Sequence, residues 1–398
     1  MAGIIKNHLG REIKSPHMGL EIKLPHLSLD IKSADPTMSE SGMESPKEQI
    51  LFFGSRYQRK ENTWVILLFV VLHLVVFVAT MFINDCPQNS RGDCSLKSLG
   101  RFSFQSLAEN PLLGPSSSTL DEMGALQRSS VIQHHQLWRL ATWIWLHAGV
   151  IHLILNLSSV IFIGIRLEQQ FGPLRIGIIY LLSAFLGSLA STLFVQYSAA
   201  VGSSGALFGL LGAMLSGLIQ NWGIYADKVA ASTMLFVLAI INLVLGLLPH
   251  VDNFSNIGGF LSGILLGFVL LYNPLLCRVE QKKGLFDYDV RSSMRLKDKL
   301  DKPAMRIASL VLFGLVLSGG VVAVLRGVNA NECCSWCHYI NCAPTKWWNC
   351  NEKATQCEVM VSVGRLTLTC EENGHFRIYP YADISEARVR DLCSQICS

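Results

Sequence analysis

A serine flanked by glycines opens one apolar stretch of the chain. Ser204 lies in the sequence Gly202-Ser203-Ser204-Gly205, directly before an apolar run that continues to about residue 220. Small neighbours allow a second backbone to approach the serine closely. A serine at a helix N-terminus also faces unpaired backbone N–H groups, which can stabilise an oxyanion. Close packing of helices would explain the same small residues, so packing remains the alternative interpretation of this pattern.

Two polar residues are placed to act together in an earlier apolar run. His152 and Asn156 are four residues apart, so they share one face of a helix. Both side chains can donate a hydrogen bond toward one point. A third polar residue, His147, precedes them. The alternative is that these side chains only hold helices together by hydrogen bonds.

A further polar group begins a later run. Asn256 is followed by Gly259 and Gly263, a pair of small residues four apart that favours close contact with another helix. If Ser204, His152 and Asn256 lie at the same end of their helices, they can meet at one depth. Polar side chains inside apolar segments are costly, so we interpret these three as parts of a functional site.

The elements that must position these residues are membrane-spanning helices. Half of the 398 residues are hydrophobic and only 16% are charged, against about 25% in soluble domains. About 20 apolar residues suffice to cross a bilayer, and backbone polar groups in lipid must be satisfied within a helix. We therefore predict an all-α polytopic membrane protein. Its seven expected spans are 63–83, 141–163, 173–196, 201–220, 230–249, 253–276 and 305–326.

The basic residues predict the orientation. Lys and Arg favour the cytosolic side, and they are frequent both just before the first span and in the segment 277–304. This places the N-terminus in the cytosol and the C-terminus on the lumenal or extracellular side. Eleven of the 12 Cys fall on that predicted lumenal side, where disulfides form. The C-x-x-C pair Cys334 and Cys337 leaves a zinc module as the alternative, although no second pair follows.

The chain divides into five predicted parts. Residues 1–62 form a disordered cytosolic tail with three nonapeptide repeats, for which a docking motif is the alternative. Next come a six-span core at 63–276, a basic cytosolic loop at 277–304 and a seventh transmembrane helix at 305–326. A small Cys-rich lumenal domain at 327–398 ends the chain, and its alternating residues 357–369 suggest strands.

The combined motifs resemble the rhomboid family of intramembrane serine proteases, and the plant branch in particular. The resemblance covers about 58–276 plus the seventh span, and it includes the Cys-rich C-terminal tail. The matching positions are Trp138, Arg139, His147, His152, Asn156, Glu168, Gly202, Ser204, Gly205, Gly259 and Gly263. G-x-S-G alone is a weak signal, whereas all of these motifs in the family's order are a strong one. The resemblance implies a rhomboid-like six-helix bundle plus a seventh helix.

The resemblance also implies roles for the site residues. Ser204 would be the nucleophile, and His152, Asn156 and the Ser204 amide would form the oxyanion hole. Trp138, Arg139, His147, Glu168 and the glycines would be structural. The family's general base is a histidine in the motif A-H-x-x-G-x-x-x-G, and here that position is Asn256. An asparagine amide cannot accept the serine's proton, although it could hold Ser204 by a hydrogen bond.

The missing histidine makes an inactive member of the family the favoured prediction. Such a pseudoprotease would bind transmembrane client proteins in the lipid bilayer for trafficking or quality control. It would lie in the secretory pathway (Golgi, endoplasmic reticulum or plasma membrane) and need no cofactor, metal ion or nucleic acid. The alternative is an active protease that cleaves single-span proteins. It would require a stand-in base among His250, His73, His134 and His135, or a histidine-encoding allele. A transporter fits poorly, because the spans show no inverted repeat.

Overall fold

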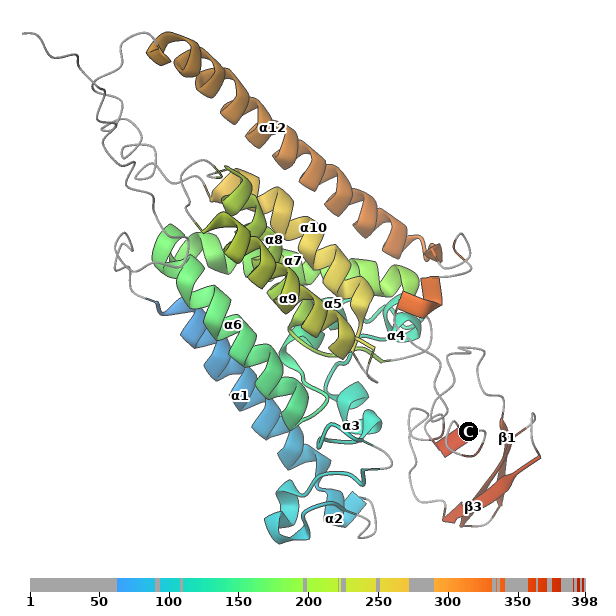
Figure 1. Ribbon diagram of the computed structural model, residues 1–398. Helices are drawn as coiled ribbons and strands as arrows, with labels where there is room; N and C mark the ends of the chain where they lie inside the picture. The colour runs from blue at the N-terminus through green and yellow to red at the C-terminus, as the bar shows by residue number, and fades with distance from the viewer. Residues whose placement is uncertain are drawn as a thin grey trace, which may run out of the picture. The chain divides into compact units, whose positions relative to one another are not determined.

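A computed structural model of the chain describes the elements that carry these residues (Figure 1). The structure describes residues 63–89, 94–107, 110–195, 199–220, 222, 227–247, 251–271, 290–330, 334, 337–340, 357–362, 364–370, 374–380, 389, 392–393 and 396. The predicted tail with nonapeptide repeats lies outside these residues, as does the part 277–289 of the predicted loop 277–304.

Within the described part of the chain, five helices are long and apolar enough to cross a membrane. They are α1 (Val65–Asn84), α6 (Val150–Phe171), α7 (Pro173–Phe194), α10 (Asn253–Leu270) and the Pro303–Leu325 part of α12 (Val290–Leu325). Two shorter apolar helices, α8 (Ser204–Gln220) and α9 (Lys228–Leu245), lie in the remaining two expected spans. The prediction of an all-α polytopic membrane protein is confirmed.

The second span begins later than its apolar run suggested. The expected segment 141–163 starts with α5 (Arg139–Thr142), η3 (Trp143–Trp145) and a non-helical stretch, and α6 starts only at Val150. Gly149 is the reason, because a Cβ atom there would overlap the carbonyl oxygen of Leu112. Val150 N–H in turn donates to Leu113 O at 3.0 Å. A loop that is remote in sequence thus sets where the helix starts.

Helix α8 is the most enclosed element of the bundle. It contacts α6, α7, α9 and α10, and nearly all of its side chains are buried. Its contact with α10 is a direct approach of two backbones. A Cβ atom at Gly259 would overlap the carbonyl oxygen of Gly205, and one at Gly263 would overlap that of Gly209. The predicted small-residue face of α10 therefore packs against α8. On α8, this contact begins at Gly205, the residue after Ser204.

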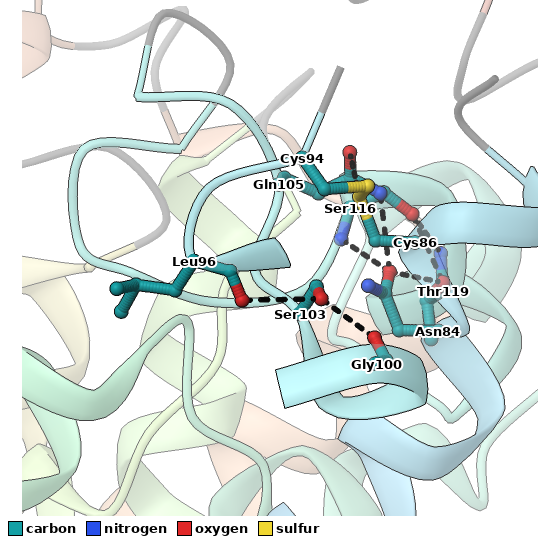
Figure 2. The surroundings of a disulfide bond; sticks show 9 residues. All are labelled: Asn84, Cys86, Cys94, Leu96, Gly100, Ser103, Gln105, Ser116 and Thr119. Carbon is teal, nitrogen blue, oxygen red and sulfur yellow. Dashed lines mark hydrogen bonds between the residues drawn. A yellow bond between two sulfur atoms is a disulfide. The ribbon is translucent and has the colours of Figure 1, made fainter. Parts of the chain in front are cut away.

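The segment between α1 and α5 folds around the C-terminal end of α1 (Figure 2). It contains α2 (Cys86–Asn89), η2 (Lys97–Phe102), α3 (Ser117–Glu122) and α4 (Arg128–Ile132). Asn84 Oδ1 accepts hydrogen bonds from Ser116 N at 2.9 Å, Thr119 Oγ1 at 3.1 Å and Gln105 Nε2 at 3.4 Å. A disulfide joins Cys86 to Cys94 next to this group. One buried amide thus holds three parts of the segment together.

Trp138 and Arg139 lie at the end of this segment and have different surroundings. Trp138 is half exposed, whereas Arg139 is buried. Arg139 Nη1 donates to Asp121 Oδ1 at 2.9 Å and to Ala125 O at 2.7 Å, and its guanidinium carbon lies 5.1 Å from the centre of the Trp138 ring. Arg139 therefore ties α3 and the turn after it to the start of α5.

The seventh membrane helix is held at its C-terminal end by Arg128. Arg128 Nη2 donates to Gly327 O at 2.8 Å, and Nη1 donates to Thr192 O at 2.6 Å. Helix α12 also contacts α7 and α10. It begins at Val290, so the last part of the predicted loop 277–304 is helical.

The described part of the C-terminal region contains a small antiparallel sheet. Strands β1 (Cys357–Ser362), β2 (Arg365–Cys370) and β3 (Phe376–Pro380) pair in the order β1-β2-β3. Disulfides join Cys334 to Cys337 and Cys357 to Cys393, and Cys370 is also disulfide-bonded. Since the C-x-x-C sulfurs are bonded to each other, this pair does not supply the thiolates that the zinc alternative requires.

Glu168 closes the other end of α1. Its side chain is fully buried, and its two carboxylate oxygens accept hydrogen bonds from Val65 N at 2.9 Å and Ile66 N at 3.0 Å. The first N–H groups of a helix have no partner within the helix, and Trp64, the residue before α1, provides no side-chain cap. Glu168 on α6 therefore caps the N-terminus of α1, a different helix of the same chain.

Replacing this carboxylate should destabilise the bundle. We expect Glu168→Ala to lower the free energy of unfolding by about 2 kcal/mol, because two buried N–H groups lose a charged acceptor. Glu168→Gln should cost less, since one amide oxygen can still accept. Gln169→Ala, on the same helix turn and only partly buried, is the matched control. Thermal unfolding in detergent measures the difference, and equal midpoints for Glu168→Ala and Gln169→Ala would contradict the capping role.

Candidate functional site

The ring of His152 lies against the backbone that leads to Ser204. A Cβ atom at Gly202 would lie 2.7 Å from His152 Cε1 and 3.1 Å from Nε2. Gly202 also has φ +132°, which a side chain would strain. Both features require glycine here, so Gly202 allows α6 and the start of α8 to approach each other. The predicted neighbours His152 and Ser204 are therefore brought to one place.

The protonation of His152 follows from its hydrogen bond. Ala148 N–H donates to His152 Nδ1 at 3.4 Å. Because Nδ1 accepts, the proton of the neutral ring is on Nε2, the nitrogen that faces Gly202. A donor at this position suits an anionic oxygen near Ser204, as an oxyanion hole requires.

Ser204 is the first residue of α8 and is almost completely buried. Among the residues that the structure describes, no side chain is hydrogen-bonded to its hydroxyl. Its position at the helix N-terminus leaves the first backbone N–H groups of α8 without acceptors in their own helix. The setting thus combines a hydroxyl, helix N–H groups and His152, but the described residues place no hydrogen-bonded base on the hydroxyl.

Asn156 lies one turn after His152 on the same helix. Its Nδ2 donates to His152 O of its own helix at 3.2 Å, which uses one of its two N–H groups. Its buried Oδ1 has no hydrogen-bond partner within the described part of the chain. The four-residue spacing predicted a shared face correctly, whereas the direction of the amide depended on the carbonyl one turn away.

Asn256 is fully buried near the start of α10, and its amide bonds to its own helix. Nδ2 donates to Asn253 Oδ1 at 2.9 Å. Within the described residues, this amide bonds to Asn253 and no hydrogen bond joins it to Ser204. Oδ1 of Asn256 has no partner among the described residues. The sequence analysis did not single out Asn253. Its one signal there was a second asparagine three residues before Asn256, at the start of the same apolar run.

The residue before Asn256 fits tightly between two helices. Ser255 is fully buried, and its Oγ lies 3.0 Å from a Cβ position at Gly187 and 2.5 Å from one at Gly205. This hydroxyl has no hydrogen-bond partner in the described structure. The family motif has an alanine here, so the added oxygen is buried without compensation. Gly187 and Gly205 make the space in which it fits.

Removing this hydroxyl should therefore stabilise the protein. We expect Ser255→Ala to raise the free energy of unfolding by about 1 kcal/mol, because a buried unsatisfied polar group is lost without leaving a large cavity. Ser262→Ala on the same helix is the matched comparison and should destabilise, since Ser262 Oγ accepts from Ser183 Oγ at 3.1 Å. Thermal unfolding of both variants gives the sign of each change. A loss of stability in Ser255→Ala would show that its hydroxyl is satisfied in the membrane.

Two other histidines lie next to hydroxyl groups other than that of Ser204. His147 Nε2 lies 3.4 Å from the hydroxyl of Ser203, the residue before the predicted nucleophile. His73 Nε2 lies 2.8 Å from the Tyr180 hydroxyl. His134 and His135 are exposed, and His250 lies outside the described residues.

The contacts of His147 and His73 belong to a buried group of polar side chains next to Ser203 and His152. The His147 ring is edge-on to those of His73 and His152, with centroids 5.1 and 5.3 Å apart. Within the described part of the chain, no three His, Cys, Asp or Glu side chains are placed to bind a metal ion. Through these contacts, His147 is next to the Ser203 hydroxyl and the His152 ring. Polar residues inside otherwise apolar runs were its signal in the sequence.

Comparison with known proteins agrees with this arrangement. Residues 134–273 match the family model described as "Rhomboid domain". The chain is 49% identical over 329 residues to "Inactive RHOMBOID-like protein 8" of Arabidopsis thaliana, covering 82% of this chain and 93% of that protein. It is also 49% identical over 335 residues to "RHOMBOID-like protein 1" of the same plant, covering 84% and 85%.

A more distant similarity reaches an animal protein. "Inactive rhomboid protein 1" of Danio rerio is 37% identical over 209 residues, which are 52% of this chain and 22% of that protein. The two plant proteins match over most of their own length, and the family match spans the helices that carry His152, Ser204 and Asn256. This chain is therefore a multi-pass membrane protein that belongs to the rhomboid family.

Proposed function

We propose that this protein is a rhomboid pseudoprotease, which binds transmembrane client proteins without cleaving them. One observation carries the proposal: the base position is Asn256, and its amide donates to Asn253 while the Ser204 hydroxyl has no base among the described residues. A serine hydroxyl without a base is a poor nucleophile. In a soluble serine protease, loss of the histidine alone costs on the order of 10⁶ in turnover.

The retained parts of the site support a binding function. Gly202, Gly205 and Gly259 still bring α6, α8 and α10 together, and His152 still faces the start of α8. Helix α9 also presents large apolar side chains outward, with Val229 70% and Phe236 67% exposed. Within a bilayer, such a surface can pack against another transmembrane helix as well as against lipid. We assign client binding to the rhomboid bundle on these grounds.

The names of the relatives point in the same direction for part of the family. Two of the proteins cited above carry "inactive" in their names, whereas "RHOMBOID-like protein 1" does not. We further propose that the chain functions in trafficking or quality control within the secretory pathway. The basic segment before α1 and the Cys-rich C-terminal region support a cytosolic N-terminus and a lumenal C-terminus.

The proposal is tested by measuring cleavage and binding in the same liposomes. The full chain and Ser204→Ala are reconstituted with a tagged single-span substrate, and a polyleucine span serves as the matched control for binding. We expect no cleaved product from either form and equal co-isolation of the substrate, above the polyleucine control. Cleavage by the unmodified chain that Ser204→Ala abolishes would establish the rival function, an active protease. Co-isolation no better than polyleucine would refute client binding.

A further inference from the structure

One buried side chain connects three segments around the base position. Asn253, the first residue of α10, is 3% exposed. Its Nδ2 donates to Ile340 O at 2.8 Å and to Leu243 O at 3.1 Å. Its Oδ1 accepts from Asn256 Nδ2 at 2.9 Å. The last turn of α9, the first turn of α10 and a turn beyond the seventh span thus share a single amide.

The turn beyond the seventh span is also held by a disulfide and by apolar packing. It is the short helix η6 (Cys337–Ile340), and a disulfide from Cys337 to Cys334 closes the chain just before it. Cys337 is buried in an apolar cluster with Val195 and Phe254. Phe254 in turn stacks on Phe194, with ring centroids 4.4 Å apart. The turn is therefore packed against the ends of α7 and α10 as well as hydrogen-bonded to Asn253.

The chemistry of the amide makes its direction depend on that turn. An asparagine side chain has two N–H donors and one carbonyl oxygen. The carbonyls of Ile340 and Leu243 occupy the donor side, so the oxygen must face Asn256. Without the Ile340 carbonyl, one N–H of Asn253 would be buried without an acceptor. The amide would then be less strongly held with its oxygen toward Asn256. The carbonyl from the C-terminal region thus helps to fix the acceptor that Asn256 uses.

The Asn253 side chain fills the space beside Gly246, the residue that follows α9. A Cβ atom at Gly246 would overlap the Asn253 amide. Gly246 has φ −66°, so an alanine there is not strained by its backbone and would act on Asn253 through contact alone. This gives a second and independent way to disturb Asn253, without touching the turn Cys337–Ile340 or the disulfide.

We propose that the turn Cys337–Ile340 acts in cis as a cap on the candidate site, and that Asn253 is the positioning residue that transmits its docking to residue 256. The proposal goes beyond the proposed function, because the cap sets the geometry of position 256 whether or not a client is bound. It assigns a role to the start of the Cys-rich region. That region is then a part of the site's architecture and not only an appended domain.

The first test measures hydrogen exchange in the full chain in lipid nanodiscs. The readout is the exchange of amides 256–262 in α10. Cys334→Ser with Cys337→Ser should speed this exchange about tenfold, because release of the cap lowers the free energy of local opening. Asn253→Leu and Gly246→Ala should have the same effect. Asn242→Leu is the control, since Asn242 is also buried but, among the described residues, its side chain bonds to Leu238 O of its own helix.

The outcomes of this test separate the cap from a loss of folding. Unchanged exchange in the double serine variant, with Asn253→Leu still fast, would overturn the role of the turn. If the double variant does not fold, Gly246→Ala decides: exchange equal to that of Asn242→Leu would overturn the role of Asn253. None of these outcomes depends on catalysis or client binding, so failure here is distinct from failure of the proposed function.

A second test distinguishes positioning from simple support. In the background Asn256→His, the rate of fluorophosphonate labelling is measured against pH with Asn253→Leu or Asn242→Leu added. We expect Asn253→Leu to lower the rate about tenfold across the profile, because the orienting acceptor for the new ring is lost. Asn242→Leu should leave the rate unchanged. Equal rates in the two double variants would overturn the positioning role of Asn253.

Discussion

Asn256→His should give this protein a serine that reacts with fluorophosphonates, whereas the unmodified chain should not label. The Nδ2 group of Asn256 donates to Asn253 Oδ1 at 2.9 Å, so a ring N–H placed there would find the same acceptor. An acceptor on one ring nitrogen directs the other toward its substrate, as in the Ser-His-Asp arrangement. We expect labelling to rise on the order of 10²-fold, the lower part of what a positioned general base contributes.

The expected recovery is partial because other features have also changed. Ser255 replaces the family's alanine beside the base and is wedged between Gly187 and Gly205. Adding Ser255→Ala to Asn256→His should therefore raise labelling further, since the first turn of α10 can then settle closer to α8. This combination separates an effect of the base from an effect of the packing beside it.

The controls identify the reacting group. Ser204→Ala in the Asn256→His background should abolish labelling, and Asn242→His, which places a buried histidine on α9, should not produce it. Strong labelling of the unmodified chain, lost in Ser204→Ala, would refute the pseudoprotease proposal. It would show that a histidine such as His250, or a water molecule, activates the serine. Labelling that persists in Ser204→Ala would instead point to Ser203, whose hydroxyl lies 3.4 Å from His147 Nε2.

Gly259→Ala should be among the most destabilising single-methyl substitutions in the bundle. A Cβ atom at Gly259 would overlap the carbonyl oxygen of Gly205. The oxygen belongs to the backbone and the Cβ atom is bonded directly to it, so neither atom can move away by a side-chain rotation. Overpacking of this kind typically costs 1–3 kcal/mol, so we expect a loss of about 3 kcal/mol. With an unfolding entropy of about 2.1 cal/mol/K per residue over 398 residues, that corresponds to a fall of about 4 °C in the thermal midpoint. The measurement is thermal unfolding in detergent.

The matched control is the same substitution where space is open. A Cβ atom at Gly314 in α12 would have nothing within 4 Å, so Gly314→Ala should leave the midpoint unchanged or raise it slightly. Because Gly259 lies one turn after Asn256, its variant should also move the base position away from Ser204. Equal midpoints for the two alanine variants would contradict this prediction. They would show that α8 and α10 can move apart at little cost.

The sequence by itself predicted which segments are apolar enough to cross the membrane and which residues are candidates for the site. Length and hydrophobicity of a segment are local properties, so the apolar runs predicted the helices that carry Ser204, His152 and Asn256. The small residues at Gly202, Gly205 and Gly259 predicted close helix contacts, and the structure places them there. Position 256 is one residue in a motif, and its identity could be judged without coordinates.

Only the tertiary structure decided where helices begin and what the polar atoms bond to. Helix α6 starts at Val150 because the Leu112 carbonyl lies against Gly149, and α1 is capped by Glu168 from 103 residues away. Amide directions are set by whichever carbonyls the fold brings near, as for Asn156 and its own helix. The acceptor for Asn253 comes from Ile340, 87 residues later in the chain. A hydrogen bond requires two groups at about 3 Å, and spacing along a sequence cannot give that distance for segments so far apart.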